Sequence, residues 1–247
     1  MPAEPNRFSP RELTWRGRAS YAAHLFKAVA KQHHRELVPA LRPLVPPDAV
    51  VFDVGAHAGQ FTKLFARLAP RGRVYAFEPG GYALSILGRA VRWRRLTNVT
   101  IVPAALGDRA GWGTLATPIK QGGSRGFGLS HLGRPDGRWP AGCEQVRVLT
   151  LDLFAAESGL GRLDFIKADI EGWEGRMIAG GLATLDRFRP ALLLELVDGH
   201  LARAGDSVAG LWDRLVGLGY RPRLWRAGSG FEELPEPRSG DVFWLPR

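Results

Sequence analysis

The segment Val51–Thr62 reads VFDVGAHAGQFT and decides the fold. It joins an apolar run at 49–54 to a helical pattern at 61–68 through a turn that contains Gly55 and Gly59. Glycines let such a turn bend tightly and approach a ligand closely, and the first N–H groups of the helix are open to that ligand. Ligands of open α/β sheets bind beyond the carboxyl ends of the strands. The segment therefore predicts a buried strand, a nucleotide-binding turn and a helix.

The same alternation of strand and helix continues along the chain. Further strands are expected at 73–77, 99–102, 163–168, 191–196, 221–225 and 241–245, with 228–240 connecting the last two, and helices at 82–93, 173–185 and 207–218. Strands that alternate with helices at this spacing imply right-handed crossovers and a parallel sheet. We predict an α/β fold with about seven strands.

Two regions depart from the alternation. A loose segment at 1–18 and a helix at 20–37, with Phe26 on its apolar side, precede a stiff proline-rich connector, so we expect an N-terminal extension at 1–47 and one domain at 48–247. Residues 112–142 are too rich in Gly and Pro for regular elements, although 114–116 and 145–149 fit a hairpin that flanks them. A loop of this length is either a lid over a site or a disordered surface insertion.

Composition excludes several classes of protein. The 247 residues are 45% hydrophobic, and Cys143 is the single cysteine, which excludes a disordered chain and a disulfide scaffold. No apolar run approaches the ~18–20 residues of a membrane helix, and the N-terminus lacks a signal-peptide core. We expect a soluble, cytoplasmic protein. Its net charge of +10 and the cluster of arginines at 89–95 fit a binder of nucleic acid or of an anionic surface, but we favour the explanation of an arginine-favouring genome and do not expect a nucleic-acid partner from charge alone.

The side chains of the glycine turn favour one class of nucleotide. His57 stands where the dinucleotide fingerprint has its second Gly, and it would crowd a pyrophosphate. Asp53 would repel a diphosphate, but it suits the positive amino group of a ligand such as S-adenosylmethionine. Glu78, at the end of the strand 73–77, can accept hydrogen bonds from both ribose hydroxyls. Glu78 fits NAD equally well, so it supports an adenosine ligand without choosing between the two.

A second set of side chains could carry the chemistry. Asp169, Glu195 and His200 follow strands at the same sheet edge and are candidate catalytic residues, together with Glu171, because a base is needed to take a proton from an acceptor hydroxyl. A surface or packing histidine is an equally good interpretation of His200. A divalent cation between Asp169 and Glu195 is an alternative, but zinc-ligand spacing is absent and we predict no metal site. We assign Lys167 no role beyond packing or a solvated charge, and Trp173 no role beyond packing.

The sequence resembles the FkbM family of S-adenosylmethionine-dependent methyltransferases. The matching pieces are VFDVGAHAGQFT at 51–62, VYAFEP at 74–79, NVTIVPAALGDRAG at 98–111, LTLDLF at 149–154, DFIKADIEGWEGRMIAGG at 164–181 and RPALLLEL at 189–196. The resemblance implies a Rossmann-like class I methyltransferase fold, with a seven-stranded, mostly parallel sheet, one reversed strand and helices on both faces. It also implies O-methylation of a hydroxyl on a sugar, glycan or natural-product scaffold.

The resemblance also implies a set of cofactor-binding residues. They are Asp53, Gly55, Ala56, His57, Gly59, Glu78, Pro79, Ala104, Ala105, Leu106 and Asp169. The turn would hold the amino-acid part of S-adenosylmethionine, Glu78 the ribose, and residues 104–106 the adenine, while Asp169 would lie near the reacting centre. The acceptor would be a small molecule or a glycan. An RNA methyltransferase, a nicotinamide-dependent oxidoreductase and a protein with the fold but no activity remain the alternatives.

Overall fold

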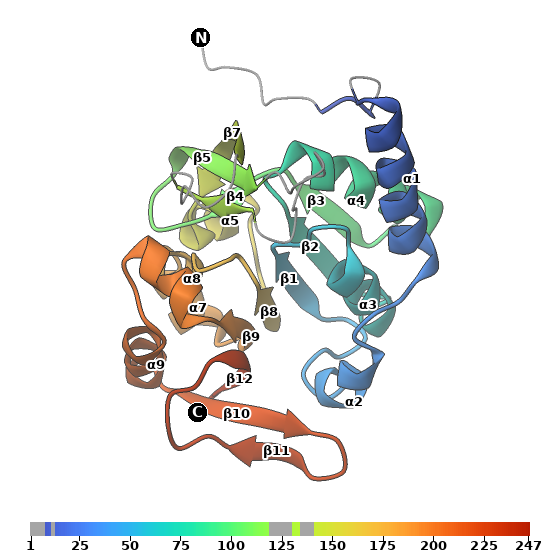
Figure 1. Ribbon diagram of the computed structural model, residues 1–247. Coiled ribbons are helices and arrows are strands. Elements are labelled where there is room, and N and C mark those ends of the chain that lie inside the picture. The colour runs from blue at the N-terminus through green and yellow to red at the C-terminus, as the bar shows by residue number, and fades with distance from the viewer. Residues whose placement is uncertain (1–7, 11–12, 119–129, 134–140) are drawn as a thin grey trace.

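A central eight-stranded sheet organises the structure, a computed structural model that describes residues 8–10, 13–118, 130–133 and 141–247 (Figure 1). Its order is β3–β2–β1–β8–β9–β12–β10–β11. The strands are β1 (Val50–Val54), β2 (Arg73–Phe77), β3 (Val99–Val102), β8 (Phe165–Ala168), β9 (Ala191–Leu196), β10 (Tyr220–Arg226), β11 (Gly230–Glu233) and β12 (Gly240–Pro246). The five strands from β3 to β9 are parallel, whereas β12 runs antiparallel to both β9 and β10.

The predicted α/β class is confirmed, and the strand count differs by one. The additional strand, β11, falls in the segment 228–240 that was expected to be only a connection. It pairs antiparallel with β10, and the ring of Trp225 packs against that of Phe231 at 5.1 Å. The tight hairpin and its aromatic cross-strand pair stabilise β11, which is too short to be predicted from its own sequence.

Helices cover both faces of the sheet, as expected. The helices are α1 (Trp15–Ala30), α2 (Val38–Leu41), α3 (Gln60–Leu68), α4 (Gly81–Trp93), α5 (Leu151–Glu157), α6 (Glu174–Ala179), α7 (Leu182–Phe188), α8 (Asp198–Leu201) and α9 (Val208–Gly217). Successive strand residues point to opposite faces. Val51 and Phe165 therefore pack with Phe65 of α3, whereas Phe52 and Ile166 belong to the cluster that contains the apolar side chains of α6 and α9.

A second, four-stranded sheet lies beside the first. Its order is β4–β7–β5–β6, with β4 (Ala105–Leu106), β5 (Gly111–Pro118), β6 (His131–Leu132) and β7 (Ala141–Leu149). The expected hairpin is confirmed but longer, since β5 pairs with β7 from Gly111 to Pro118. The expectation that residues from 111 onward are irregular was wrong there, because the full antiparallel ladder satisfies the backbone despite the glycines. Of the expected lid, 119–129 and 134–140 lie outside the described residues.

Two helix predictions need correction. Helix α1 begins at Trp15, where the Thr14 hydroxyl caps it, and ends at Ala30 rather than at residue 37. It ends there because Lys31 is extended and His34 has a left-handed backbone. The helix expected at 173–185 is two helices, α6 and α7. At the break, a Cβ on Gly180 would lie 2.1 Å from the carbonyl oxygen of Gly107, so the chain turns where only glycine fits.

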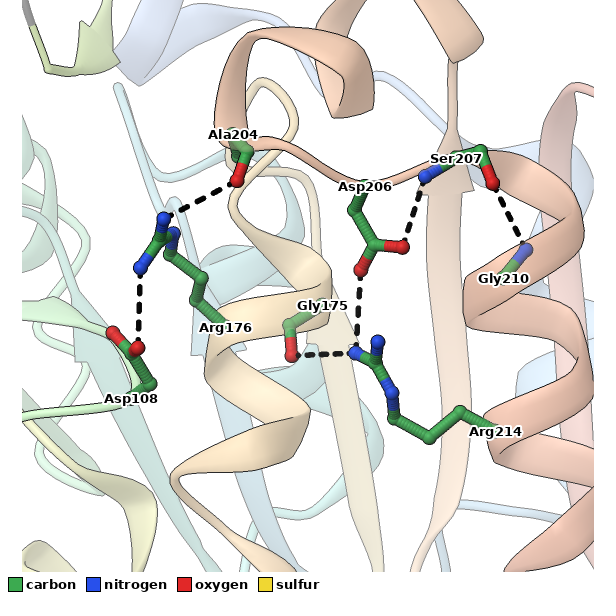
Figure 2. A network of polar contacts seen from close by, with 8 residues as sticks. All are labelled: Asp108, Gly175, Arg176, Ala204, Asp206, Ser207, Gly210 and Arg214. Atoms are coloured by element: carbon green, nitrogen blue, oxygen red, sulfur yellow. Dashed lines mark hydrogen bonds and ion pairs between the residues drawn. The ribbon is translucent and has the colours of Figure 1, made fainter.

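A polar network fixes helix α6 against its neighbours (Figure 2). Arg176 pairs with Asp108 at 3.1 Å and donates to the carbonyl of Ala204 at 3.2 Å. Arg214 of α9 donates to the carbonyl of Gly175 at 3.1 Å and pairs with Asp206 at 3.2 Å. Helix α6 directly follows the loop after β8, so the network holds that loop at the sheet edge.

Candidate active site

A cavity of about 400 Å³ lies at the carboxyl ends of the parallel strands. Its volume is within the range of small-molecule sites. Eleven of the predicted site residues line it, namely Asp53, Gly55, Ala56, His57, Glu78, Pro79, Ala104, Ala105, Leu106, Asp169 and Glu195. Gly59 and His200 are not among the lining residues. Gly59 instead precedes α3 with a φ of 80°, and a Cβ there would come within 2.7 Å of Leu87.

The N–H groups of the turn between β1 and α3 are hydrogen-bonded within the protein. Those of Gly55 and Ala56 donate to the carbonyl of Phe77 at 3.0 and 2.9 Å, and that of Gly59 donates to Ala56 at 2.8 Å. The His57 N–H donates to Oε2 of Glu78 at 2.8 Å. None of these four N–H groups is therefore open to a ligand, and helix α3 begins beyond them at Gln60. A pyrophosphate needs such donors, so this turn suits a ligand without phosphate.

Gly55 lets the first turn touch the end of β8. Its φ is 73°, and a Cβ would lie 2.0 Å from the carbonyl oxygen of Asp169. A non-glycine residue would have both an unfavourable backbone conformation and a collision with main-chain atoms. The glycine thereby brings the ends of β1 and β8 together at the middle of the cavity.

Glu78 is held in place by two backbone donors. Its Oε2 accepts from His57 and its Oε1 accepts from the N–H of Gly80, each at 2.8 Å. Burial raises the pKa of Glu78 to about 7, although these two hydrogen bonds favour the charged form. Each carboxylate oxygen keeps a second lone pair. Glu78 can therefore accept hydrogen bonds from two neighbouring hydroxyls of a ligand.

The wall beyond Glu78 combines apolar side chains with one further carboxylate. Ala104, Ala105 and Leu106 are buried and line the cavity. Glu144 of β7 also lines it, and its Oε2 accepts from the N–H of Gly81 at 3.1 Å. Sequence reasoning missed Glu144, because only the pairing of the second sheet brings β7 to this wall. Together with the glycine turn, this wall and Glu78 form what we call the β1–β2 half of the cavity.

Lys167 lies at the centre of the cavity, between the β1–β2 half and the opposite side. This position corrects the interpretation of Lys167 as a packing residue or a solvated charge. Its side chain is only 6% exposed, and its Nζ lies 3.8 Å from Oδ1 of Asp53 and 3.6 Å from Oδ2 of Asp169. The ammonium also lies 5.1 Å from the ring centre of Phe61. Burial raises the pKa of Asp53, and the charge of Lys167 opposes that shift. Trp173 also lines the cavity, so it is more than a packing residue.

A pairing argument could have found Lys167. It is in register opposite Asp53 on the neighbouring strand, and it lies two residues before Asp169. Residues two apart share one face of a strand. The three charged side chains are therefore neighbours once β1 and β8 are known to be adjacent.

The other side of the cavity, which we call the β8–β12 half, gathers three carboxylates. Glu195 and Asp169 both line the cavity, and Asp241 is in register opposite Glu195. Burial, followed by the charge of Asp169, raises the pKa of Glu195 to about 8, and Asp241 adds to the effect. The negative charges around Glu195 thus favour its protonated form. Sequence reasoning missed Asp241, which reaches this edge because β12 runs in the opposite direction to its neighbour.

Two histidines border the β8–β12 half. His34, from the segment after α1, lines the cavity and stacks on Phe61 at 4.2 Å between ring centres. His200 lies behind Glu171, with its Nδ1 3.0 Å from Oε2 of that residue. Burial lowers the pKa of His200 and raises the pKa of Glu171 to about 7. His200 thus contacts a lining residue rather than the cavity. Within the described ranges, no group of three or more His, Cys, Asp or Glu side chains is arranged to hold a metal ion.

The fold is that of the class I methyltransferases, with the cavity at the carboxyl edge of a mostly parallel sheet. The family model named Methyltransferase FkbM domain matches residues 53–222, and the chain belongs to this family. The crystal structure of Methyltransferase FkbM from Methylobacillus flagellatus KT aligns with a TM-score of 0.52 at 14% identity, over 93% of this chain and 59% of that chain. That likeness concerns the fold alone.

Two relatives match part of the chain. The 2-O-methyltransferase NoeI from Sinorhizobium fredii is 29% identical in an alignment of length 168 that covers 63% of this chain and 65% of NoeI. The AMB antimetabolite synthetase AmbE from Pseudomonas aeruginosa is 29% identical in an alignment of length 202 that covers 69% of this chain and 10% of AmbE. This chain thus corresponds to less than two thirds of NoeI and to a small part of AmbE.

Proposed function

We propose that the protein transfers a methyl group from S-adenosylmethionine to a hydroxyl of a sugar, glycan or natural-product scaffold. The observation that carries the proposal is the fixed carboxylate of Glu78 beside a turn whose N–H groups are used within the protein. That combination suits a ribose without a pyrophosphate. The name of NoeI, a 2-O-methyltransferase, supports a hydroxyl acceptor.

The β1–β2 half fits the cofactor. Glu78 would accept hydrogen bonds from the ribose hydroxyls, and the apolar wall at 104–106 would contact the adenine. The buried carboxylate of Asp53, whose Oδ1 has no hydrogen-bond donor among the described residues, would attract the amino group of the amino-acid part. Gly55, Ala56, His57 and Pro79 would complete the surface around it, whereas Gly59 would shape the turn from outside.

The β8–β12 half fits the acceptor. S-adenosylmethionine brings a methyl group on a sulfonium, which is already a strong donor, so the protein mainly needs to orient the acceptor oxygen. The carboxyl groups of Asp169 and Glu195 would receive the proton of the acceptor hydroxyl. His200 would act through Glu171 as a positioning residue. In this proposal 48–247 is the catalytic domain, and the extension at 1–47 contributes His34.

Calorimetric titration tests the cofactor. Wild-type protein should bind S-adenosylmethionine and S-adenosylhomocysteine, and Glu78→Ala should weaken both by at least about tenfold, because hydrogen bonds to a charged group contribute ~1.5–3 kcal/mol. Glu157→Ala, an exposed carboxylate on α5, is the matched control and should change neither affinity. Folded wild-type protein that binds NAD and neither of these ligands would overturn the proposal.

A further inference from the structure

The outer face of α1 carries an apolar stripe that no other part of the described chain covers. Trp15, Ala19, Ala22, Phe26 and Ala30 recur at the spacing of one helix face, and all are exposed. The side chain of Trp15 is 74% exposed and that of Phe26 is 69% exposed. The opposite side of α1 packs on α4 through Tyr21, Ala28 and their neighbours. Phe26, expected on the packed side of its helix, is therefore on the free side.

Basic side chains flank this stripe. Residues 13–35 and 79–107, which contain α1 and α4, include no Asp or Glu. Their exposed basic residues are Arg16, Arg18, Lys27, Lys31, Arg35, Arg89, Arg92 and Arg95. Trp93, at the end of α4, is 76% exposed, and the next residue, Arg94, donates to the carbonyl of Val29. The second group of basic residues thus lies close to the end of α1.

We propose that this α1–α4 face, made of the exposed side chains of α1 and of residues 89–95, docks onto an anionic phospholipid surface. Helix α1 would lie in the plane of the interface. Helices that do so combine an apolar face with Trp or Phe and a border of Lys and Arg. Tryptophan favours the headgroup level, and juxtamembrane basic residues are attracted to anionic lipids. No helix of the described chain could cross a bilayer, so the docking is peripheral.

The face favours lipid over the other anionic or apolar partners. Three of the five stripe residues are alanines, which offer neither hydrogen bonds nor stacking to a nucleic acid, so only Trp15 and Phe26 of the stripe could stack on bases. A second copy of the chain would bring two sets of like charges together. A bilayer accepts the apolar stripe and the charges at the same time. The proposal is independent of the proposed methyl transfer, because none of its residues lines the cavity.

The face nevertheless lies close to the cavity. Tyr82, which lines the cavity, forms a 3.0 Å hydrogen bond with His24 of α1. Gln32, just after α1, donates to the carbonyl of Gln60, another lining residue, at 3.0 Å. Docking would therefore hold the cavity within one helix layer of the lipid surface.

Sedimentation with vesicles tests the proposal. Wild-type protein should bind vesicles of phosphatidylcholine mixed with phosphatidylglycerol, and much less those of phosphatidylcholine alone, with binding that weakens as salt is raised. Trp15→Ala/Phe26→Ala and Arg16→Glu/Lys27→Glu should each lower the partition coefficient at least about tenfold. The matched controls are Trp112→Ala/Leu182→Ala and Arg221→Glu/Arg238→Glu, which change exposed residues elsewhere and should stay within about twofold of wild type.

Three outcomes would overturn the proposal. They are absence of wild-type binding to the anionic vesicles, equal losses in the control variants, and tighter binding to a single-stranded RNA oligonucleotide that depends on the same four residues. If circular dichroism shows that a double variant is not folded, fluorescence quenching by lipids replaces the sedimentation test of that variant. Brominated lipids should quench the tryptophan fluorescence of the wild type, and Trp15→Phe/Trp93→Phe should remove most of that quenching. Undiminished quenching in this variant would contradict the docking.

Discussion

The two halves of the cavity hold their carboxylates in different ways. In the β1–β2 half, backbone N–H groups fix Glu78, and these donors come from a turn and a strand end close to it in sequence. In the β8–β12 half, Asp169, Glu195 and Asp241 face one another, and Lys167 offers the nearby positive charge at 3.6 Å from Asp169. Glu78 is positioned by the main chain, whereas the other three carboxylates lie near one another and one of them, Asp169, pairs with the ammonium of Lys167.

This difference has a chemical meaning under the proposed function. A fixed acceptor of hydrogen bonds suits a ligand that must bind in one orientation. Neighbouring carboxyl groups, whose like negative charges repel one another, can take up and release protons near neutral pH. The first half is thus suited to holding a cofactor, and the second to receiving a proton.

Gly55→Ala should have the largest effect, because Gly55 joins the two halves. A side chain at this φ of 73°, with a Cβ 2.0 Å from the Asp169 carbonyl, combines strain and overpacking, which together lower the free energy of unfolding by about 4 kcal/mol. Urea unfolding measures the loss. Gly88→Ala in α4, where no atom lies within 4 Å of an added Cβ, is the control and should keep or raise stability. Equal stabilities of the two variants would refute the close contact at Gly55.

Lys167→Met should come second, since it removes the cation between the halves. Asp53 would remain fully buried without a positive neighbour, which lowers the free energy of unfolding by about 3 kcal/mol. Adding Asp53→Asn should restore at least about 1 kcal/mol, because the uncompensated charge is then gone. Lys27→Met, an exposed lysine, should change stability by less than about 0.5 kcal/mol. The lack of any rescue by Asp53→Asn would show that Lys167 acts through its packing alone.

The stability of the ligand-free protein should fall as pH rises from 6 to 8. The pKa of Glu78 is about 7 and that of Glu195 about 8, so the folded state keeps protons that the unfolded chain has released. Stabilisation from such groups is complete below their unfolded pKa and is lost as pH rises through the folded value. We expect a decrease in Tm of at least about 2–4 °C, which corresponds to about 1 kcal/mol in a protein of this size.

Two variants assign this pH dependence to the halves. Glu78→Gln should flatten the slope around pH 7, and Glu195→Gln should flatten it nearer pH 8. Asp48→Asn is the control, because a hydrogen bond from Arg162 lowers the pKa of Asp48 and its stabilisation is lost only at acidic pH. A slope that survives in both glutamine variants would assign it instead to Glu171 and Glu174, whose pKa burial also raises to about 7.

Asp241→Asn should have the smallest effect, and that effect should be confined to the β8–β12 half. Removing its charge lowers the pKa of Glu195, which carboxyl-carbon NMR of labelled protein detects as a titration at lower pH. Affinity for S-adenosylhomocysteine should stay within about twofold, because Asp241 lies opposite Glu195 rather than near Glu78. A large change in affinity with no change in the titration would contradict the division into two halves.

The sequence predicted the parts of the site that are local. The strand, turn and helix around Gly55 and the strand-end positions of Glu78 and Asp169 followed from periodicity and from turn chemistry, and the structure places these residues around one cavity. The break at Gly180 was missed because a glycine pair inside a helical pattern shows no trace of the Gly107 carbonyl that packs on it. The eighth strand was missed because a four-residue run has too little periodicity to be distinguished from a loop.

By itself, the sequence determined the fold class, the family resemblance and the glycine turn, because each rests on neighbours in the chain. Only the tertiary structure decided that Lys167 is buried between Asp53 and Asp169, that the reversed strand β12 brings Asp241 to Glu195, and that His34 reaches the cavity. It also decided that the N–H groups of the glycine turn are hydrogen-bonded within the protein and that the apolar side chains on the outer face of α1 are exposed. These features depend on which strands are adjacent and on where water is excluded, and residues far apart in sequence meet only after the sheet has formed.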